Sequence, residues 1–459
     1  MGQRLQELPY TPDTASIFNQ LASWHWAVFL DSGSGNGRQG RYDIIAAEPF
    51  VTLVTRGDRT KITSRQGSIF STDDPFELLR AWLQPTETKS GDLPFSGGAL
   101  GYFSYDLGRR IERLPVLAAD DEQLPEMAVG IYDWALVVDH EEQRSWLVAA
   151  GRDPEAARRW EELVALFRQI EPMELEQELP PFSVRGAVQS SLSYAQYAAG
   201  FGKIARYIRE GDCYQVNYAQ RFEVDCDGDT WTAYRHFREI NPAPFSAYLN
   251  LPFLKVLSAS PERFIQVTDR QIITQPIKGT APRSADPVTD RKLAEALENS
   301  LKDQAENVMI VDLLRNDLSK NSELFSVKVP RLFELQSFAT VHHLVSTITG
   351  RLNAGKDAID LLRGCFPGGS ITGTPKIRAM EIIEELEMHR RGIYCGSIGY
   401  IGFNGDMDTS IVIRTLSIKD GKMRYWAGGG IVVDSRLEGE YQESLDKARA
   451  MRDLVDVCR

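Results

Sequence analysis

Hydrophobic and polar positions in the first 170 residues alternate as β-strands require, with short helical stretches between them. WHWAVFLDSG (24–33) predicts a buried strand that ends in a turn, and VGIYDWALVVDHEEQRSWLVAA (129–150) predicts a hairpin. Apolar residues spaced three and four apart predict helices in FELLRAWL (76–83) and EAARRWEELVALFRQI (155–170). Residues 1–170 therefore form a mixed α and β region.

A second region, 192–459, follows an acidic stretch. Residues 171–191 lie in IEPMELEQELPPFSVRGAVQSS, which contains prolines and no clear period, so we interpret them as a linker. Beyond it, YAQYAAGFGKIARYIREGDCYQ predicts a helix closed by Gly211, and the longest helix is expected over about 286–317. Strands mostly follow strands in both regions, which favours an antiparallel α+β fold over βαβ winding.

Composition excludes several classes of protein. The 459 residues include 64 acidic and 52 basic side chains, a net charge of −12, which argues against nucleic-acid binding but not against a local pocket for a small anion. The five cysteines are scattered without a CxxC pair, so neither a disulfide framework nor a thiolate zinc site is expected. With no signal-peptide pattern and no run of about 20 apolar residues, we expect a cytoplasmic setting.

Two glycine-rich segments resemble nucleotide-binding motifs without their context. GNGRQG (35–40) matches GxGxxG, but the text after it is strand-like, so a hairpin loop is the better interpretation. GGSITGTPK resembles a phosphate loop, but Lys376 is displaced by two residues and follows a proline. We therefore expect neither a Rossmann fingerprint nor a Walker A motif.

The segment FPGGSITGTPKIRAMEIIEELEMHRRG (366–392) is a loop that leads into a helix. Its glycines allow close backbone approach, while Thr374 and Pro375 predict the N-cap and the first helical position. The basic pair before Gly392 predicts the end of that helix. Its free N–H groups could attract an anion, although a plain loop-to-helix junction explains the same pattern.

Acidic residues are spaced to share helix faces. Asp303 and Glu306 lie three apart on the long helix, and after a predicted capping box, SRLE (435–438), Glu440, Glu443 and Lys447 fall on one face. Each set could simply be solvated or could support the helix dipole. If the two faces meet, the carboxylates need a cation, and oxygen-only ligands favour Mg²⁺.

Three further residues carry possible chemistry. Lys278 in QPIKGT is either solvated or a partly buried nucleophile, with Glu262 in SASPERF as an acid/base partner across a hairpin. His343, beside a strand, is either a core histidine or functional. Arg414 lies within the apolar strand SIVIRTLS, where a substrate carboxylate would balance its charge.

Together these segments resemble the chorismate-utilising enzymes in the family's own order, from about Leu192 to Val457. The matching text is QPIKGT, AENVMIVDLLRND, VHHLVSTITG, FPGGSITGTPKIRAMEIIEELE, YCGSIGYIGF, TSIVIRT, AGGGIVVDS and EYQESLDKA. PFSGGALGYFSYDLGRR and MAVGIYDWALVVDH resemble the family's N-terminal region. The resemblance implies a large two-sheet antiparallel sandwich with helices packed outside, like that of anthranilate synthase component I.

Within the family, the chain resembles the folate-pathway branch, the aminodeoxychorismate synthases, because anthranilate synthases resemble QPIAGT where this chain has Lys278. The resemblance implies that Lys278 attacks C2 of chorismate, that Glu262 is the general acid/base, and that ammonia adds at C4 to give 4-amino-4-deoxychorismate. The alternatives are an anthranilate synthase, an isochorismate synthase, or a binding protein that retains the fold.

The same resemblance implies a set of ligands and a partner. Mg²⁺ would be bound by Glu306, Glu443, Glu440 and Asp303. The implied substrate contacts are Gly279, Thr280, His343, Ser370, Tyr394, Arg414, Gly428, Gly430 and Lys447. Ammonia would come from a glutamine amidotransferase on a separate chain, since no amidotransferase nucleophile segment is visible. FLDSG (29–33) and NPAPF (241–245) partly resemble segments that form a tryptophan pocket in anthranilate synthases.

Overall fold

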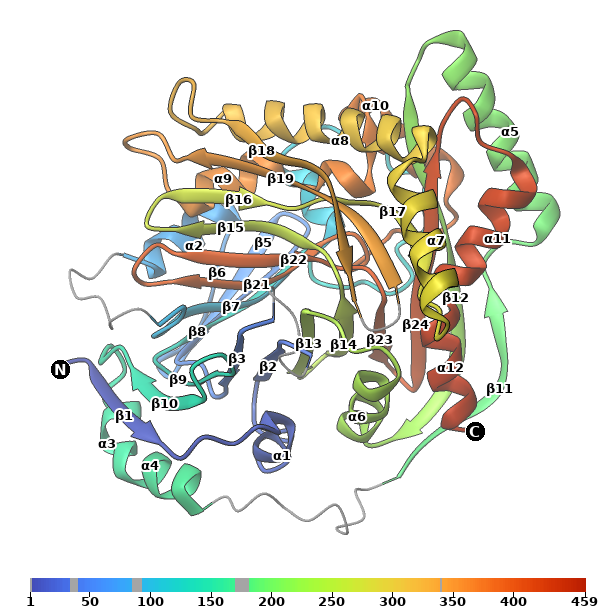
Figure 1. The fold of residues 1–459 in the computed structure, drawn as a ribbon. Coiled ribbons are helices and arrows are strands. Elements are labelled where there is room, and N and C mark those ends of the chain that lie inside the picture. The colour runs from blue at the N-terminus through green and yellow to red at the C-terminus, as the bar shows by residue number, and fades with distance from the viewer. Residues whose placement is uncertain (1, 34–39, 85–92, 170–180, 339–340) are drawn as a thin grey trace.

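Two antiparallel sheets of twelve strands each are stacked together, with helices on their outer sides (Figure 1). The structure is a computed structural model, which describes residues 2–33, 40–84, 93–169, 181–338 and 341–459. This architecture confirms the two-sheet sandwich that the resemblance implied. No helix within these ranges has the length and apolar character needed to cross a membrane.

The first sheet combines strands from both ends of the chain. In order across the sheet, its strands are β1 (Arg4–Leu8), β10 (Arg144–Ala149), β9 (Trp134–Asp139), β3 (Tyr42–Ala46), β2 (Ala27–Asp31), β13 (Phe245–Leu251), β14 (Leu254–Ser260), β23 (Thr415–Lys419), β24 (Lys422–Ile431), β12 (Gln215–Gly228) and β11 (Phe182–Ser190), with β20 (Gly373–Thr374) also paired to β12. The N-terminal region joins the rest where β2 pairs with β13, Phe29 opposite Tyr248.

The second sheet is built in the same interleaved way. Its order is β17 (Ile277–Pro282), β19 (Val341–Arg351), β16 (Gln271–Thr274), β15 (Arg263–Thr268), β22 (Met407–Ile411), β21 (Ser397–Gly402), β7 (Gly98–Phe103), β8 (Met127–Tyr132), β4 (Val51–Arg56), β5 (Arg59–Ser64) and β6 (Gly67–Ser71), with β18 (Lys328–Ser337) also paired to β19. Strand β7 is rich in glycine, and a Cβ at Gly98 or Gly101 would collide with a neighbouring carbonyl, so other backbone approaches this strand closely.

Helices cover the two outer faces. They are α1 (Thr14–Phe18), α2 (Pro75–Trp82), α3 (Pro154–Arg158), α4 (Trp160–Gln169), α5 (Tyr194–Glu210), α6 (Thr230–Ile240), α7 (Pro287–Glu298), α8 (Leu301–Ser319), α9 (Ala358–Cys365), α10 (Lys376–Leu386), α11 (Leu437–Lys447) and α12 (Arg449–Val457). Apolar residues of β2 and β13 meet those of β7 and β21 between the sheets, while α4, α6 and α12 pack on the first sheet and α2, α8 and α9 on the second.

Several sequence predictions hold and others need correction. Helix α5 ends at Gly211, which adopts the left-handed conformation expected of a closing glycine. The helix expected over 286–317 is two helices, because Ser300 caps α8 after a break at Asn299. The described part of the predicted linker is also different: Phe182–Ser190 is strand β11, paired with β12. The division at residues 170 and 192 stays a prediction.

Two helix ends were placed wrongly from the sequence. Thr374 lies in strand β20 and Pro375 is the N-cap of α10, which ends at Leu386 rather than near Gly392. Before α11, Arg436 is the N-cap and Ser435 makes no capping bond. Its hydroxyl donates instead to Glu440, at 2.6 Å, because that carboxylate turns back toward the start of its own helix. The GNGRQG segment, apart from Gly40, lies outside the described residues.

We predict that Phe29→Ala lowers the free energy of unfolding by about 3–5 kcal/mol, as large-to-small changes in a packed core do. The Phe29 ring is fully buried and stacks on Phe18 with 5.4 Å between centroids. The measurement is urea denaturation. Phe70→Ala on the exposed strand β6 is the control, and its effect should stay within about 0.5 kcal/mol. Equal losses in the two variants would contradict the assigned core.

Candidate active site

Lys278 points into the protein. It lies on β17, its side chain is 13% exposed, and its Nζ is 3.4 Å from Glu306 Oε1 on α8. The same amine donates a hydrogen bond of 3.0 Å to the carbonyl oxygen of Ser370. Gly279 follows with φ +79° where the pairing with β19 shifts its register, so the strand bends just after the lysine. The amine is therefore partly buried rather than solvated, as its interpretation as a nucleophile requires.

Glu262 reaches the same place from the connection between β14 and β15. It is 5% exposed, and Ser370 Oγ donates to its Oε1 at 2.7 Å. Burial raises the pKa of the Glu262 carboxyl, although the charges of Lys278 and Lys447 and the Ser370 hydrogen bond oppose that rise. Ser370 thus contacts both candidate catalytic groups, one through its carbonyl and the other through its hydroxyl.

Three glycines, Gly428, Gly429 and Gly430, lie near the end of strand β24, and acidic groups gather around them. A Cβ at Gly430 would lie 3.0 Å from Glu306 Oε1, and one at Gly429 would lie 3.2 Å from both Glu440 Oε2 and Glu443 Oε1. Glu306 Oε1 also accepts a 2.9 Å hydrogen bond from Gln215 Nε2. Helices α8 and α11 therefore bring their predicted acidic faces to one stretch of backbone. A side chain at either glycine would press on these groups, and at Gly430 it would first meet the amide nitrogen of Gln215.

Lysines offset part of this negative charge. Lys447 Nζ lies 2.7 Å from Glu443 Oε1, and Lys302 Nζ lies 3.8 Å from Glu440 Oε1. Burial and the nearby Glu443 charge raise the pKa of Glu440, while the hydrogen bond from Ser435 and the charges of Lys302 and Lys447 oppose that rise. For Glu443, burial acts in the same direction, but Lys447 outweighs it and leaves the pKa below its usual value.

Asp303 faces a different neighbour from the three glutamates. Its Cβ and Cγ lie 3.1 Å from the position of a Cβ at Gly279, and its carboxylate accepts a hydrogen bond from Ser300. It therefore borders β17. Among the described residues, no three acidic, histidine or cysteine side chains already converge as a preformed metal site.

The predicted substrate contacts lie near this cluster on several elements. His343, on β19, is buried, and its Nδ1 lies 2.9 Å from Thr280 Oγ1. Burial, with the charge of Arg414 nearby, lowers the pKa of His343 to about 4, so the ring is neutral near pH 7. Tyr394 is buried and stacks on Trp426, with 5.7 Å between ring centroids.

The sequence suggested that Arg414 lies in a strand, but the structure places it outside one. It occupies a bend between β22 and β23 with φ +49°, and the described residues provide no hydrogen bond or ion pair to its guanidinium. Burial lowers the pKa of Arg414 because the charged form is poorly solvated. A guanidinium in this position is suited to an anionic group of a ligand.

Sequence reasoning missed three residues that build the site. Gln215 and Asn217 belong to β12, and Arg391 donates 3.0 Å and 2.8 Å hydrogen bonds to the carbonyls of Ile371 and Asn217. Arg391 is fully buried against Glu387, 2.7 Å away. The available signal was the run QVN, in which two amides occupy alternate positions and so share one face of an otherwise apolar strand.

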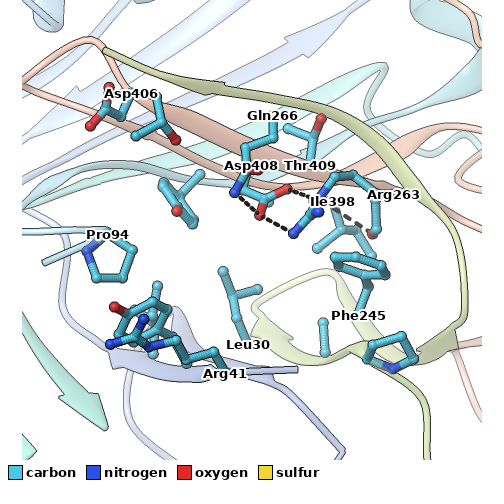
Figure 2. A pocket seen from close by; sticks show the side chains of 18 of the residues that line it. Leu30, Arg41, Pro94, Phe245, Arg263, Gln266, Ile398, Asp406, Asp408 and Thr409 are labelled. Carbon is cyan, nitrogen blue, oxygen red and sulfur yellow. Dashed lines mark hydrogen bonds and ion pairs between the residues drawn. The ribbon is translucent and has the colours of Figure 1, made fainter. Parts of the chain in front are cut away.

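A separate cavity of about 500 Å³ lies between the sheets (Figure 2). Leu30 and Phe245, from the two segments that partly resemble a tryptophan pocket, line it. Figure 2 shows Arg263 extended along one wall beside Asp408, with 3.1 Å between Nη2 and Oδ2. Arg263 directly follows Glu262 in the chain, so the cavity and the cluster around Lys278 meet at this pair of residues.

This chain is similar to known proteins over most of its length. The chorismate binding enzyme family matches residues 27–453. Aminodeoxychorismate synthase component 1 of Escherichia coli is 50% identical over 94% of this chain and 93% of its own length. Anthranilate synthase component 1 of Thermus thermophilus is 37% identical over 98% of this chain and 97% of its own.

A solved structure agrees as well. Anthranilate synthase component I of Streptococcus pneumoniae superimposes with a TM-score of 0.81 at 31% identity, covering 90% of this chain and 92% of that one. The family resemblance inferred from the motifs is therefore confirmed. This chain belongs to the chorismate-binding enzymes.

Proposed function

We propose that this enzyme aminates chorismate at C4 to give 4-amino-4-deoxychorismate. The observation that carries the proposal is the position of Lys278, whose amine is held inside the protein by Ser370 and Glu306 and shares Ser370 with the buried acid Glu262. The 50% identity with an aminodeoxychorismate synthase component 1 supports the same branch of the family.

In the first half of the proposed reaction, Lys278 first releases a proton to solvent, and its free amine then forms a bond to C2 of chorismate. The electron pairs of the ring diene shift toward C4, and the C4–O bond breaks. Glu262, whose pKa burial raises, acts as the general acid and gives its proton to the departing oxygen, which leaves as water. The lysine nitrogen then carries the positive charge of the adduct.

In the second half, ammonia forms a bond to C4 from the side where the hydroxyl left. The diene electrons shift back, the C2–N bond breaks, and its electron pair returns to the Lys278 amine. The proton released by the new amino group passes to the Glu262 carboxylate, which restores the acid. Chorismate and ammonia are thereby converted into 4-amino-4-deoxychorismate and water.

The remaining groups hold the substrate. Chorismate is a dicarboxylate, and the guanidinium of Arg414 beside neutral His343 and Thr280 is suited to one of its carboxylates. Gly428 and Gly430 are proposed to contact the substrate through their backbone, since glycine permits close approach. Tyr394, Ser370, Gly279 and Lys447 complete the proposed substrate contacts.

Mg²⁺ fits the donors around the end of β24. All of them are carboxylate oxygens, and Mg²⁺ commonly uses one or two protein carboxylates together with water and substrate. Glu306 and Glu443 would hold the ion, with Glu440 beside them and Asp303 reaching it only through water. When bound, the ion supplies positive charge that offsets a substrate carboxylate and orients the ring.

The ammonia donor is proposed to be a glutamine amidotransferase on a separate chain. The Escherichia coli relative is named component 1 of its synthase, which supports a second component. The isolated chain should then use added ammonium in place of its partner. An anthranilate synthase is the second candidate, because the Thermus thermophilus relative at 37% identity bears that name, although Lys278 favours amination at C4.

We predict that the isolated chain, given chorismate, Mg²⁺ and ammonium, forms a product that a 4-amino-4-deoxychorismate lyase converts into p-aminobenzoate. Lys278→Ala should lower this rate by about 10³-fold or more and abolish the covalent adduct, because the nucleophile is missing. Mass spectrometry detects the adduct. Lys328→Ala removes an exposed amine as the control. An adduct in Lys278→Ala, or anthranilate as the wild-type product, would contradict the proposal.

The proposed role of Glu262 predicts a pH dependence with a definite sign. The acid must be protonated, so kcat should fall as pH rises through the raised pKa of Glu262. The Ser370 hydroxyl favours the charged carboxylate, so Ser370→Ala should move this alkaline limb upward by about one pH unit. Steady-state measurements of kcat against pH give the position of this limb. Glu262→Gln, the control, should lack the limb, and a downward shift in Ser370→Ala would refute the assignment.

A metal requirement is also expected. Excess EDTA should abolish activity, and Glu443→Gln should raise the Mg²⁺ concentration for half-maximal rate by about tenfold or more. Its side chain is 45% exposed, so the free energy of unfolding should change by no more than about 0.5 kcal/mol. Glu438→Gln, exposed on the same helix, is the matched control. Full activity in EDTA would exclude the metal role.

A further inference from the structure

The two helices that carry the proposed Mg²⁺ ligands are held against the sheets by buried polar residues. The structure describes every residue of α8 and α11, and within residues 301–309 of α8 Asn307 alone is buried. In α11 the only buried residues are Glu440 and Ser444, with half-buried apolar side chains around them. Apolar contact is non-directional, so it does not by itself fix the rotation of a helix, whereas a hydrogen bond does.

Asn307 directly follows Glu306 and joins α8 to the second sheet. The hydroxyl of Ser346, on β19, donates to Asn307 Oδ1 at 2.6 Å, and the backbone N–H of Phe333, on β18, donates to the same hydroxyl at 3.2 Å. Asn307 and Ser346 are both fully buried. Successive side chains of an α-helix point about 100° apart, so a bond that fixes Asn307 also fixes the direction of Glu306.

Ser444 directly follows Glu443 and joins α11 to the first sheet. Gln220 Nε2, on β12, donates to Ser444 Oγ at 2.7 Å, and Gln220 Oε1 accepts from the hydroxyl of Ser190 at 2.7 Å. The Ser444 hydroxyl itself donates to the carbonyl of Tyr441 at 2.7 Å. Gln220 and Ser444 are fully buried, so their hydrogen bonds do not compete with bulk water.

The same arrangement thus occurs once on each sheet. We call the bonds Asn307–Ser346 and Ser444–Gln220 the sheet anchors. Glu306 and Glu443 lie around Gly429 and Gly430, where their like charges repel when no cation lies between them. Rotation of either helix would let the carboxylates move apart, but it would break an anchor and leave buried polar groups unpaired, which is costly.

We propose that Ser346 and Gln220 are positioning residues that set the separation of Glu306 and Glu443 for a cation of the size of Mg²⁺. Mg²⁺ requires near-ideal octahedral geometry with oxygens at roughly 2.1 Å, whereas Ca²⁺ tolerates irregular geometry at roughly 2.3–2.6 Å. Loss of an anchor should therefore weaken binding of the smaller ion more than binding of Ca²⁺. The inference rests on the proposed Mg²⁺ site and names residues that shape it without touching ion or substrate.

The test measures binding of the metal alone to the full chain, with Mn²⁺ followed by electron paramagnetic resonance as the probe and Ca²⁺ measured by competition. Ser346→Ala and Gln220→Met each remove one anchor from the strand side and leave both helix sequences unchanged. Each should raise the Kd for Mn²⁺ by about three- to tenfold, the range expected for one lost hydrogen bond. The Kd for Ca²⁺ should change by less than about twofold.

Two further variants define the comparison. Glu443→Gln removes a proposed ligand and so identifies which Mn²⁺ binding belongs to the site. Thr55→Val is the matched control, because it removes a buried hydroxyl that bonds to Thr60 at 2.9 Å between β4 and β5, away from both helices. It should leave both dissociation constants unchanged, whatever it does to the melting temperature.

The outcomes separate the anchors from the proposed function. An unchanged Kd for Mn²⁺ in Ser346→Ala or Gln220→Met would overturn the role of the residue replaced there, with metal binding and amination by the wild type still standing. Equal increases for Mn²⁺ and Ca²⁺, or the same increase in Thr55→Val, would overturn the inference because they indicate general loosening. A wild-type chain without the Mn²⁺ binding that Glu443→Gln abolishes would overturn the proposed metal site and the anchors together.

Discussion

A lysine inside a protein needs a counter-charge and hydrogen-bond acceptors, and the ion pair of Lys278 with Glu306 meets that requirement. The pair joins β17 of the second sheet to α8, while Gln215 joins the same carboxylate to β12 of the first sheet. One carboxylate oxygen therefore links both sheets to the layer of helices. Loss of either charge would leave its partner buried alone, which is far more costly than loss of a surface pair.

Interleaving of the two halves of the chain makes this link rigid. Strands from residues 1–170 occupy positions in both sheets. In each sheet an early strand pairs with a late one, β2 with β13 in the first and β7 with β21 in the second. The proposed catalytic cluster lies where β12, β24 and β17 come close to one another, in the part of each sheet formed by the later residues. Movement of one sheet against the other would have to break the apolar contacts between them.

Much of the candidate site and part of the local structure could be predicted from the sequence. Lys278, Glu262 and the two acidic helix faces were recognised because charged residues in apolar or periodic contexts stand out. Their meeting at Gly429 and Gly430 could not be predicted, since it depends on strand order. Ser435 was misread because a capping pattern does not reveal that Glu440 competes for the hydroxyl. Arg414 was misread because an apolar context hides a bend with positive φ.

Arg391 shows why such long-range features escape sequence reasoning and yet control the site. In the sequence, Arg391 only indicated the end of a helix. In the structure its guanidinium donates to the carbonyl of Ile371, next to Ser370, and to that of Asn217, two residues from Gln215. The loop that contacts Lys278 and Glu262 is thereby held at a fixed distance from the strand that contacts Glu306. A rigid arginine fork can span both carbonyls while pairing with Glu387, whereas a lysine offers only a point charge. The position of the catalytic groups relative to one another thus depends on a buried charge that touches none of them.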